Sequence, residues 1–325
     1  MTDLPKIMLI VNSQATNFTA RKLKVIVSAL NSLGNLKTVH TKDRGHASEI
    51  AKESAENGVD IVFVLAGDGT LNEAAQSLIN TNTVLAPIPG GSTNVFSRAI
   101  GYSNDTIEAL GQLIESIENQ SYKTIGVGKV DDRIFLFNAG FGLDAEVIAR
   151  VERNTKIKKI AAHPYTFYNA LATYSHGYDK KNQTLRMTLD GEVNPNIRIL
   201  SSDPTVFTNA NIVVVSNLSP WTYFGKREIV LAPTASIDNE LTITAIRSLS
   251  LIKLLRFGAS AMGRHRTVMH HKDIAHCEGV AHSVIQANTN AIPYQLDGDY
   301  IGSTMKVEVD FLPNALKIAI PLNSE

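Results

Sequence analysis

Short apolar runs alternate with stretches of helical periodicity between Ile7 and about Ile125. Two parallel strands cannot be joined by a tight turn, and a helix is their usual connection, so this alternation is typical of a parallel sheet covered by helices. Apolar residues three or four positions apart mark the helical stretches, and continuous apolar runs mark buried strands. The pattern predicts strands at 7–11, 36–40 and 61–65, and helices at 19–33, 47–57, 71–79 and 94–100.

After Ile125 the pattern changes to β-prone runs around the hairpin signals Asp131-Asp132 and Asp190-Gly191. We expect a β-sandwich or barrel here, and an added strand of the first sheet from the last apolar run, Leu316 to Pro321. Strands are predicted at 134–138, 184–189, 206–216, 241–246, 283–287 and 305–310, and helices near 164–174 and 250–262. The expected architecture is an α/β parallel-sheet domain of residues 1–125 plus about 312–325, and a β-sandwich domain of residues 126–311.

The charge balance limits the partners of the chain. Its 325 residues carry 31 Lys and Arg against 31 Asp and Glu, and 44% are hydrophobic. This composition excludes a disordered chain, and zero net charge argues against nucleic acid as the main partner. The single cysteine, Cys277, cannot form an internal disulfide. No signal-peptide pattern opens the sequence, and the run 7–11 is too short to cross a bilayer, so we expect a cytoplasmic protein.

The sharpest local feature is a loop with two glycines directly after the predicted strand 61–65. It reads Ala66-Gly67-Asp68-Gly69-Thr70-Leu71-Asn72-Glu73. Glycine lets the backbone approach a phosphate closely, and the amides at the start of the next helix point at it. Asp68 adds a carboxylate for a phosphate-bound Mg²⁺. A tight turn capped by Thr70 is the alternative for this segment taken alone.

A second loop of the same kind follows, from Pro87 to Phe96. Gly90 and Gly91 precede Ser92, Thr93 and Asn94, whose side chains could cap a helix or hold a nucleotide. Neither loop matches a P-loop, and neither completes the dinucleotide-binding pattern. A phosphate site here would be of another kind.

Together these segments resemble the bacterial diacylglycerol kinase and sphingosine kinase family of lipid kinases, with its Gly-Gly-Asp-Gly-Thr and Gly-Thr-x-Asn-Asp loops. The resemblance runs over nearly the whole chain. The matching segments are Thr41 with Gly45-His46-Ala47, the two glycine loops, Asn138 to Asp144, Pro233 to Leu241, and Leu296-Asp297-Gly298-Asp299.

The resemblance implies an ATP-dependent phosphotransferase that uses Mg²⁺. Asp299 stands where the family has its proton acceptor, and Asp68 would orient the catalytic Mg²⁺, held largely by the phosphates, or act as an alternative base. The candidate nucleotide-binding residues are Thr41, Ala66, Gly67, Asp68, Gly69, Thr70, Leu71, Asn72, Glu73, Gly91, Ser92, Thr93 and Asn94.

Several positions depart from the family pattern, among them Asp238-Asn239-Glu240, which stands where the family has Asp-Asp-Gly. Ala66 replaces the first glycine, Val95 replaces the Asp after Asn94, and Asn12-Ser13 stands where Asn-Pro is usual. The family's structural metal ligands map to Ser236, Asn239 and Leu241. Asn239 offers a neutral oxygen where a carboxylate is expected, which weakens the expectation of a structural Mg²⁺.

The resemblance favours diacylglycerol as the lipid that accepts the phosphoryl group, with ceramide, sphingosine and a polyprenol left open. An NAD kinase is the nearest rival enzyme, because that related family shares the first glycine loop. A lipid or nucleotide sensor that has lost turnover is a rival of another class. A homodimer also stays open.

A lipid kinase has to meet its substrate at a membrane surface, and two segments suit a transient contact with its inner face. Five basic residues lie between Arg150 and Lys159, and Trp221-Thr222-Tyr223-Phe224 precedes Lys226-Arg227. Basic and aromatic side chains together favour an anionic membrane. A solvated helix face and aromatic packing under a loop are the alternatives.

Overall fold

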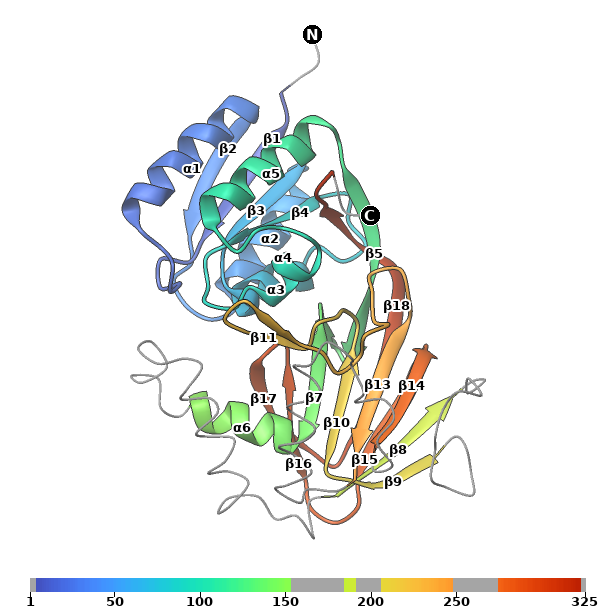
Figure 1. Ribbon diagram of the computed structural model, residues 1–325. Coiled ribbons are helices and arrows are strands. Elements are labelled where there is room, and N and C mark those ends of the chain that lie inside the picture. Colours follow the sequence, from blue (N-terminus) through green and yellow to red (C-terminus); the bar gives the residue numbers. More distant parts are fainter. Residues whose placement is uncertain (1–3, 153–183, 191–205, 248–273, 323–325) are drawn as a thin grey trace. The chain divides into compact units, whose positions relative to one another are not determined.

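The computed structural model describes residues 4–152, 184–190, 206–247 and 274–322 (Figure 1). The helices expected near 164–174 and 250–262, the turn at Gly191 and most of the basic segment 150–159 lie outside these ranges. The chain forms two compact units, residues 1–126 with 313–325 and residues 127–312.

The first unit is built on a parallel sheet of order β2-β1-β3-β4-β18. Residues of β1, β3 and β4 are buried almost without interruption, since helices cover both faces of the sheet, and this explains their continuous apolar runs. Its strands are β1 (Lys6–Val11), β2 (Asn35–His40), β3 (Ile61–Ala66), β4 (Val84–Pro89) and the C-terminal part of β18 (Lys306–Ala319).

The helices of this unit form two pairs, α1 with α5 and α2 with α3. Crossovers between parallel strands are right-handed, and the chain steps from β1 to β2 in one direction and from β2 to β3 in the other, so α1 and α2 cover opposite faces. The helices are α1 (Ala20–Leu33), α2 (His46–Glu56), α3 (Asp68–Gln76), α4 (Val95–Ala99) and α5 (Thr106–Glu118).

Two details of the first unit differ from the prediction. Helix α3 begins at Asp68 and not at residue 71. Only Gly67, its N-cap, separates the end of β3 from the helix. Helix α5 is absent from the predicted helices, although Asp105 caps it by accepting hydrogen bonds from the N–H groups of Ile107 and Glu108.

The second unit is a β-sandwich, as expected. A six-stranded antiparallel sheet of order β14-β13-β10-β7-β16-β17 forms one layer, and β15, β8 and β9 with the N-terminal part of β18 form the other. Buried side chains such as Phe141, Phe207, Ile243 and Ile285 fill one core between them. Helix α6 packs against β7, β16 and β17.

The remaining elements are β5 (Tyr122–Val130), β6 (Arg133–Phe135), β7 (Asn138–Gly142), α6 (Leu143–Glu152), β8 (Leu185–Asp190), β9 (Val206–Ala210), β10 (Ile212–Ser216), β11 (Thr222–Phe224), β12 (Arg227–Ile229), β13 (Leu241–Ile246), β14 (Ile274–Val280), β15 (His282–Ala287), β16 (Ile292–Leu296) and β17 (Asp299–Thr304).

Two predicted strands are each divided in the structure. The run 206–216 forms β9 and β10, which belong to different sheets, and Asn209 before the break adopts a left-handed φ of 57°. The run 134–138 is interrupted because the N–H groups of Leu136, Phe137 and Asn138 bind the carboxylate of Asp297 and not a neighbouring strand.

Strand β18 serves both units. Its residues 306–310 pair antiparallel with β15, whereas Ile318 pairs in parallel with Leu85 of β4. The partner changes around Pro313 and Asn314, where Asn314 has a φ of 50°. The expected return of the last apolar run to the first sheet is confirmed.

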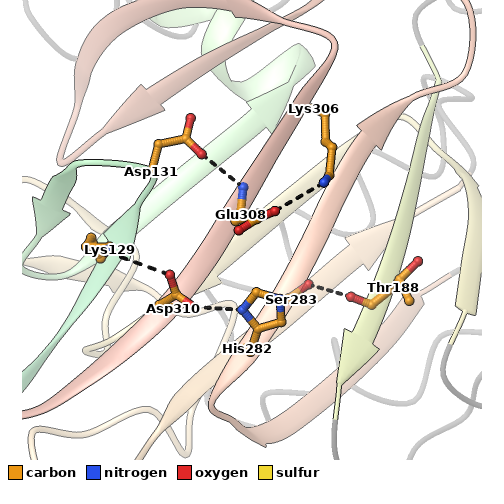
Figure 2. A network of polar contacts seen from close by, with 8 residues as sticks. All are labelled: Lys129, Asp131, Thr188, His282, Ser283, Lys306, Glu308 and Asp310. Carbon is orange, nitrogen blue, oxygen red and sulfur yellow. Dashed lines mark hydrogen bonds and ion pairs between the residues drawn. The ribbon is translucent and has the colours of Figure 1, made fainter.

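Charged side chains join β5, β15 and β18 within the second unit (Figure 2). His282 Nδ1 lies 2.6 Å from Asp310 Oδ1, and Lys129 Nζ lies 4.0 Å from the other oxygen of Asp310. Asp131 accepts the N–H of Glu308, which places the first predicted hairpin beside β18. These groups are partly exposed, so each ion pair contributes little more than about 1 kcal/mol.

Candidate active site

The candidate nucleotide site lies at the carboxyl edge of the parallel sheet. Strand β1 stands between β2 and β3, so the chain reverses direction across the sheet there, and ligands of open α/β sheets bind beside such a point. The side-chain amide of Asn12, directly after β1, donates to Thr70 Oγ1 after β3 at 2.9 Å. This bond links the two strand ends that flank the reversal.

The two glycine loops touch each other through their backbones. A Cβ on Gly91 would lie 2.7 Å from the Cα of Gly67, and a Cβ on Gly90 would lie 3.0 to 3.2 Å from three backbone atoms of Ala66. Only glycine fits both positions without moving the chain. The atoms of Ala66 nearest to Gly90 belong to its backbone, which every residue type has.

Asp68 fastens the first loop to the helix that follows the second. Its Oδ2 accepts the N–H of Val95 at 3.0 Å, and its Oδ1 accepts the N–H of Phe96 at 3.2 Å. A carboxylate at the start of α4 satisfies backbone donors that have no partner inside the helix. Val95, the departure from the family pattern, is 3% exposed and contributes its N–H here.

Asparagine side chains hold the second loop in place. Buried Asn94 adopts a left-handed φ of 49°, accepts the N–H of Gly91 at 2.8 Å and donates to Asn104 Oδ1 at 2.7 Å. Asn17 donates from Nδ2 to the carbonyl of Gly91 at 2.6 Å. Asn17 and Asn104 were missed by the sequence analysis, and only their place in loops after β1 and α4 could have suggested them.

The predicted nucleotide-binding residues follow the strand ends at this edge, but their side chains differ in exposure. Thr41 directly follows β2, and its N–H donates to the carbonyl of Val11. Ser92 is exposed, and Thr93 is partly exposed. The side chain of Leu71 is 3% exposed and belongs to the core, while Asn72, 6% exposed, accepts a hydrogen bond from Gln76. Glu73 is partly exposed on α3.

The candidate proton acceptor lies in the second unit, at the two-residue turn between β16 and β17. Asp297 and Gly298 have positive φ of 50° and 83°, as a type I′ hairpin turn requires. The carboxylate of Asp297 is buried and accepts three backbone N–H groups, so this residue anchors the turn. Asp299 starts β17 and is partly exposed.

A second carboxyl group lies behind this turn. A Cβ on Gly140 would lie 2.8 Å from Asp144 Cγ, so glycine provides the space for the Asp144 side chain. Gln295 Nε2 donates to Asp144 Oδ2 at 2.9 Å. Burial raises the pKa of the Asp144 carboxyl to about 6, and the hydrogen bond from Gln295 acts in the opposite direction. The sequence identifies the segment Asn138 to Asp144 only through its resemblance to the family and predicts no role for Asp144.

Two of the three residues expected at a structural metal, Ser236 and Asn239, make side-chain hydrogen bonds within their own loop. Asn239 directs its amide nitrogen to the carbonyl of Thr234 at 3.0 Å, and Ser236 Oγ accepts the N–H of Asp238 at 3.3 Å. Neither side chain carries a carboxylate, the usual protein ligand of Mg²⁺. Among the described residues, no group of three His, Cys, Asp or Glu side chains is arranged for a metal ion.

Comparison with known families agrees with this geometry. Residues 6–130 match the diacylglycerol kinase catalytic domain, and residues 138–320, more than half the chain, match the YegS C-terminal NAD kinase beta sandwich-like domain. The chain belongs to the diacylglycerol kinase-like family of lipid kinases.

Individual relatives of this lipid kinase family are distant. A diacylglycerol kinase of Bacillus subtilis is 32% identical over 34% of this chain and 37% of its own length. A diacylglycerol kinase of Staphylococcus aureus is 29% identical over 47% of this chain and 46% of its own. An uncharacterized protein of Synechocystis is 24% identical over 94% of this chain and 67% of its own. The chain thus spans less than half the length of the two named kinases.

Solved structures of low identity share the fold. A diacylglycerol kinase from Bacillus anthracis superposes with a TM-score of 0.69 at 21% identity, covering 100% of both chains. A yeast NADH kinase in complex with NADH reaches a TM-score of 0.52 at 12% identity, covering 99% of this chain and 86% of its own.

The contact between the glycine loops predicts the effect of a single methyl group. In Gly91→Ala the new Cβ meets backbone of the other loop, so we expect a loss of about 1–3 kcal/mol in unfolding free energy and at least tenfold weaker binding of a fluorescent ATP analogue. The control is Gly111→Ala in α5, where a Cβ meets no atom within 4 Å. It should keep ATP binding and gain up to about 1 kcal/mol. Unchanged binding by Gly91→Ala would contradict the role of the contact.

The pKa of Asp144 predicts a pH-dependent stability. Because its folded pKa of about 6 lies above the ordinary value of 3.8, the folded protein keeps a proton that the unfolded chain has released, and stability falls as pH rises through this window. Asp144→Asn removes the cost, so thermal unfolding should show the variant more stable than wild type by about 2 kcal/mol at pH 7.5, and equal to it near pH 4.

Asp105→Asn is the matched control for this titration. Hydrogen bonds from the N–H groups of Glu108 and Ile107 lower the pKa of Asp105, so wild type gains stability from this group above its unfolded pKa. The difference between variant and wild type should therefore change with pH in the opposite sense. The same sense for both variants would contradict the assignment for Asp144.

Proposed function

We propose that the protein is an ATP-dependent lipid kinase that transfers the γ-phosphoryl group of ATP to the hydroxyl of diacylglycerol and forms phosphatidic acid. One observation carries the nucleotide part: two glycine loops are joined at the carboxyl edge of a parallel sheet, with Asp68 fixed between them. Family membership supports the lipid as acceptor.

The first unit supplies the phosphate-binding groups. Helix α3 starts directly after Gly67, so the N–H groups of its first turn, which have no partner inside the helix, are directed at an anion beyond the strand end. Bound Mg²⁺ would neutralise charge on the phosphate oxygens. Asp68 is the residue that would hold it, because its carboxylate lies between the two loops, where the N–H groups of Val95 and Phe96 fix it.

Asp299 would remove the proton of the lipid hydroxyl. In the transfer, the hydroxyl oxygen bonds to the γ-phosphorus, the bond between this phosphorus and the bridging oxygen breaks, and ADP leaves with the electron pair. The hydroxyl proton passes to the Asp299 carboxylate. Asp297 and Gly298 hold the turn from which this carboxylate projects.

Two rival functions share the same fold. The yeast NADH kinase demonstrates that this architecture also occurs in a kinase of a dinucleotide. A sensor without turnover is motivated by Ala66, Val95 and Asn239. At the first two of these positions the contacts are made by the backbone, with Gly90 at Ala66 and with Asp68 at Val95, which favours the kinase.

A transfer assay separates these functions. Purified protein is incubated with γ-labelled ATP, Mg²⁺ and either dioleoylglycerol micelles or NAD. We expect label in the lipid; label in NADP would support the dinucleotide kinase, and ATP binding without transfer would support the sensor. Asp299→Asn should lower kcat at least 100-fold, as expected for loss of a general base. Asp132→Asn, an exposed turn residue, is the matched control and should keep full activity.

We also propose that the hairpin β11–β12 contacts an anionic membrane surface. It is a two-stranded sheet of its own, visible in Figure 1 beside the label β11. Phe224 stands opposite Arg227, and Phe224 is 48% exposed. Tyr223, whose side chain points to the other face, is 7% exposed. The hairpin therefore presents an aromatic ring beside the exposed cations Lys226 and Arg227.

Among the described residues, no helix is long and apolar enough to cross a bilayer. An aromatic ring inserts at the headgroup level, and each nearby cation adds about 1 kcal/mol of attraction to anionic lipid. The turn at Gly225, with a φ of 61°, places Lys226 at the tip of the hairpin.

Vesicle sedimentation tests this contact. Lys226→Glu with Arg227→Glu should reduce binding to phosphatidylglycerol-containing vesicles at least tenfold at low salt, and Phe224→Ser should reduce it at all salt concentrations. Val25→Ser, at an exposed apolar residue of α1, is the control. All variants should phosphorylate soluble short-chain dioctanoylglycerol as wild type does. Equal binding of wild type and the charge-reversal variant would refute the proposal.

A further inference from the structure

Gln295 is a buried polar residue with every hydrogen of its amide engaged. It is 2% exposed in β16. Its Nε2 donates to Asn138 Oδ1 at 3.0 Å and to Asp144 Oδ2 at 2.9 Å, and its Oε1 accepts the N–H of Gly298 at 2.8 Å. One side chain thus joins a strand, a helix and the turn before Asp299.

The backbone around Gln295 is shaped for this arrangement. Gln295 pairs with Gly140 of β7, and a Cβ on Gly140 would lie 2.5 Å from Gln295 Nε2. On the other side, the register with β17 shifts between Tyr294 and Gln295. Such a bulge re-aims the side chains next to it and is common beside active sites.

Asn138 extends the network to the anchor of the turn. Its N–H donates to Asp297 Oδ1 at 3.1 Å, and its carbonyl accepts the N–H of Asp297 at 2.8 Å. Both residues of the turn are therefore held by hydrogen bonds: Asp297 by Asn138 of β7, and Gly298 by the side chain of Gln295.

A core position does not need such a residue for burial. A buried amide gains stability only when its partners are all in place, and an apolar side chain of the same size avoids that requirement. A fully bonded network gives a unique orientation instead. Here the network fixes the orientation of the turn that precedes Asp299 and of the Asp144 carboxyl group.

We infer that Gln295 is a positioning residue for phosphoryl transfer, which holds the turn carrying Asp299 through the N–H of Gly298 and the Asp144 carboxyl through Nε2. This inference rests on the proposed kinase function. It places Gln295 behind the reacting groups, so its loss changes the rate of transfer and leaves ATP binding in the first unit unchanged.

Two variants separate the hydrogen bond that Gln295 accepts from the two that it donates. Gln295→Met keeps the size and removes all three hydrogen bonds. Gln295→Glu keeps an oxygen for the N–H of Gly298 and removes both donors. Gln286→Met, at an exposed glutamine of β15, is the matched control.

The closing experiment measures kcat and KM for ATP with dioleoylglycerol, together with hydrogen–deuterium exchange of a peptide covering 296–300. We expect Gln295→Met to lower kcat at least tenfold with KM for ATP within twofold of wild type, and to speed exchange at the turn. Gln295→Glu should lower kcat three- to tenfold and keep slow exchange at the turn, a partial rescue that loss of stability alone does not produce. The control should match wild type in all three measurements.

Wild-type kcat in Gln295→Met would overturn the inference while leaving the kinase function intact. If Gln295→Met does not fold, Gln295→Glu decides, and a kcat equal to wild type overturns the inference. If wild type transfers no phosphoryl group to lipid, the proposed function fails and the inference fails with it.

Discussion

The backbone contact between Gly67 and Gly91 is the constraint on which the nucleotide site depends. It brings the ends of β3 and β4 so close that a single Cβ would force them apart. Asp68 then binds the first N–H groups of α4, and Asn94 closes the second loop on itself. Each of these bonds requires the others, because the Asp68 carboxylate reaches α4 only while the loops touch.

This arrangement explains why some departures from the family pattern leave the site intact. At Ala66 the atoms nearest to Gly90 are backbone atoms that every residue type has, and at position 95 the contribution to the site is a backbone N–H that any residue except proline offers. Asn239 is different. It has no carboxylate, and its side-chain amide donates a hydrogen bond to the carbonyl of Thr234 within the same loop.

The fold of the first unit was predictable because its strands are buried on both faces, and continuous apolar runs carry that information locally. The limits of β9 and β10, and of β6 and β7, were not predictable from such runs. They depend on Asn209 in a left-handed conformation and on a carboxylate, Asp297, that is about 160 residues away from the N–H groups it binds. No local pattern reports a bond between segments so far apart in the sequence.

In the candidate site, too, local patterns predicted some residues, and contacts between distant segments determined the others. Glycines and acids beside predicted strand ends were found from the sequence, but the capping role of Asp68 requires that the loops after β3 and β4 be neighbours. Gln295 has no signal at all in the sequence, because a lone glutamine in an apolar run resembles an ordinary strand residue with one polar face. Its role depends on Gly140, which pairs with it, and on the turn that follows. Both contacts exist only when β7, β16 and β17 pair in the folded protein. Both units therefore hold their polar groups with hydrogen-bonded side chains. In the first unit Asp68 and Asn94 act beside the glycine contact, and in the second unit Gln295 and Asp297 hold the turn.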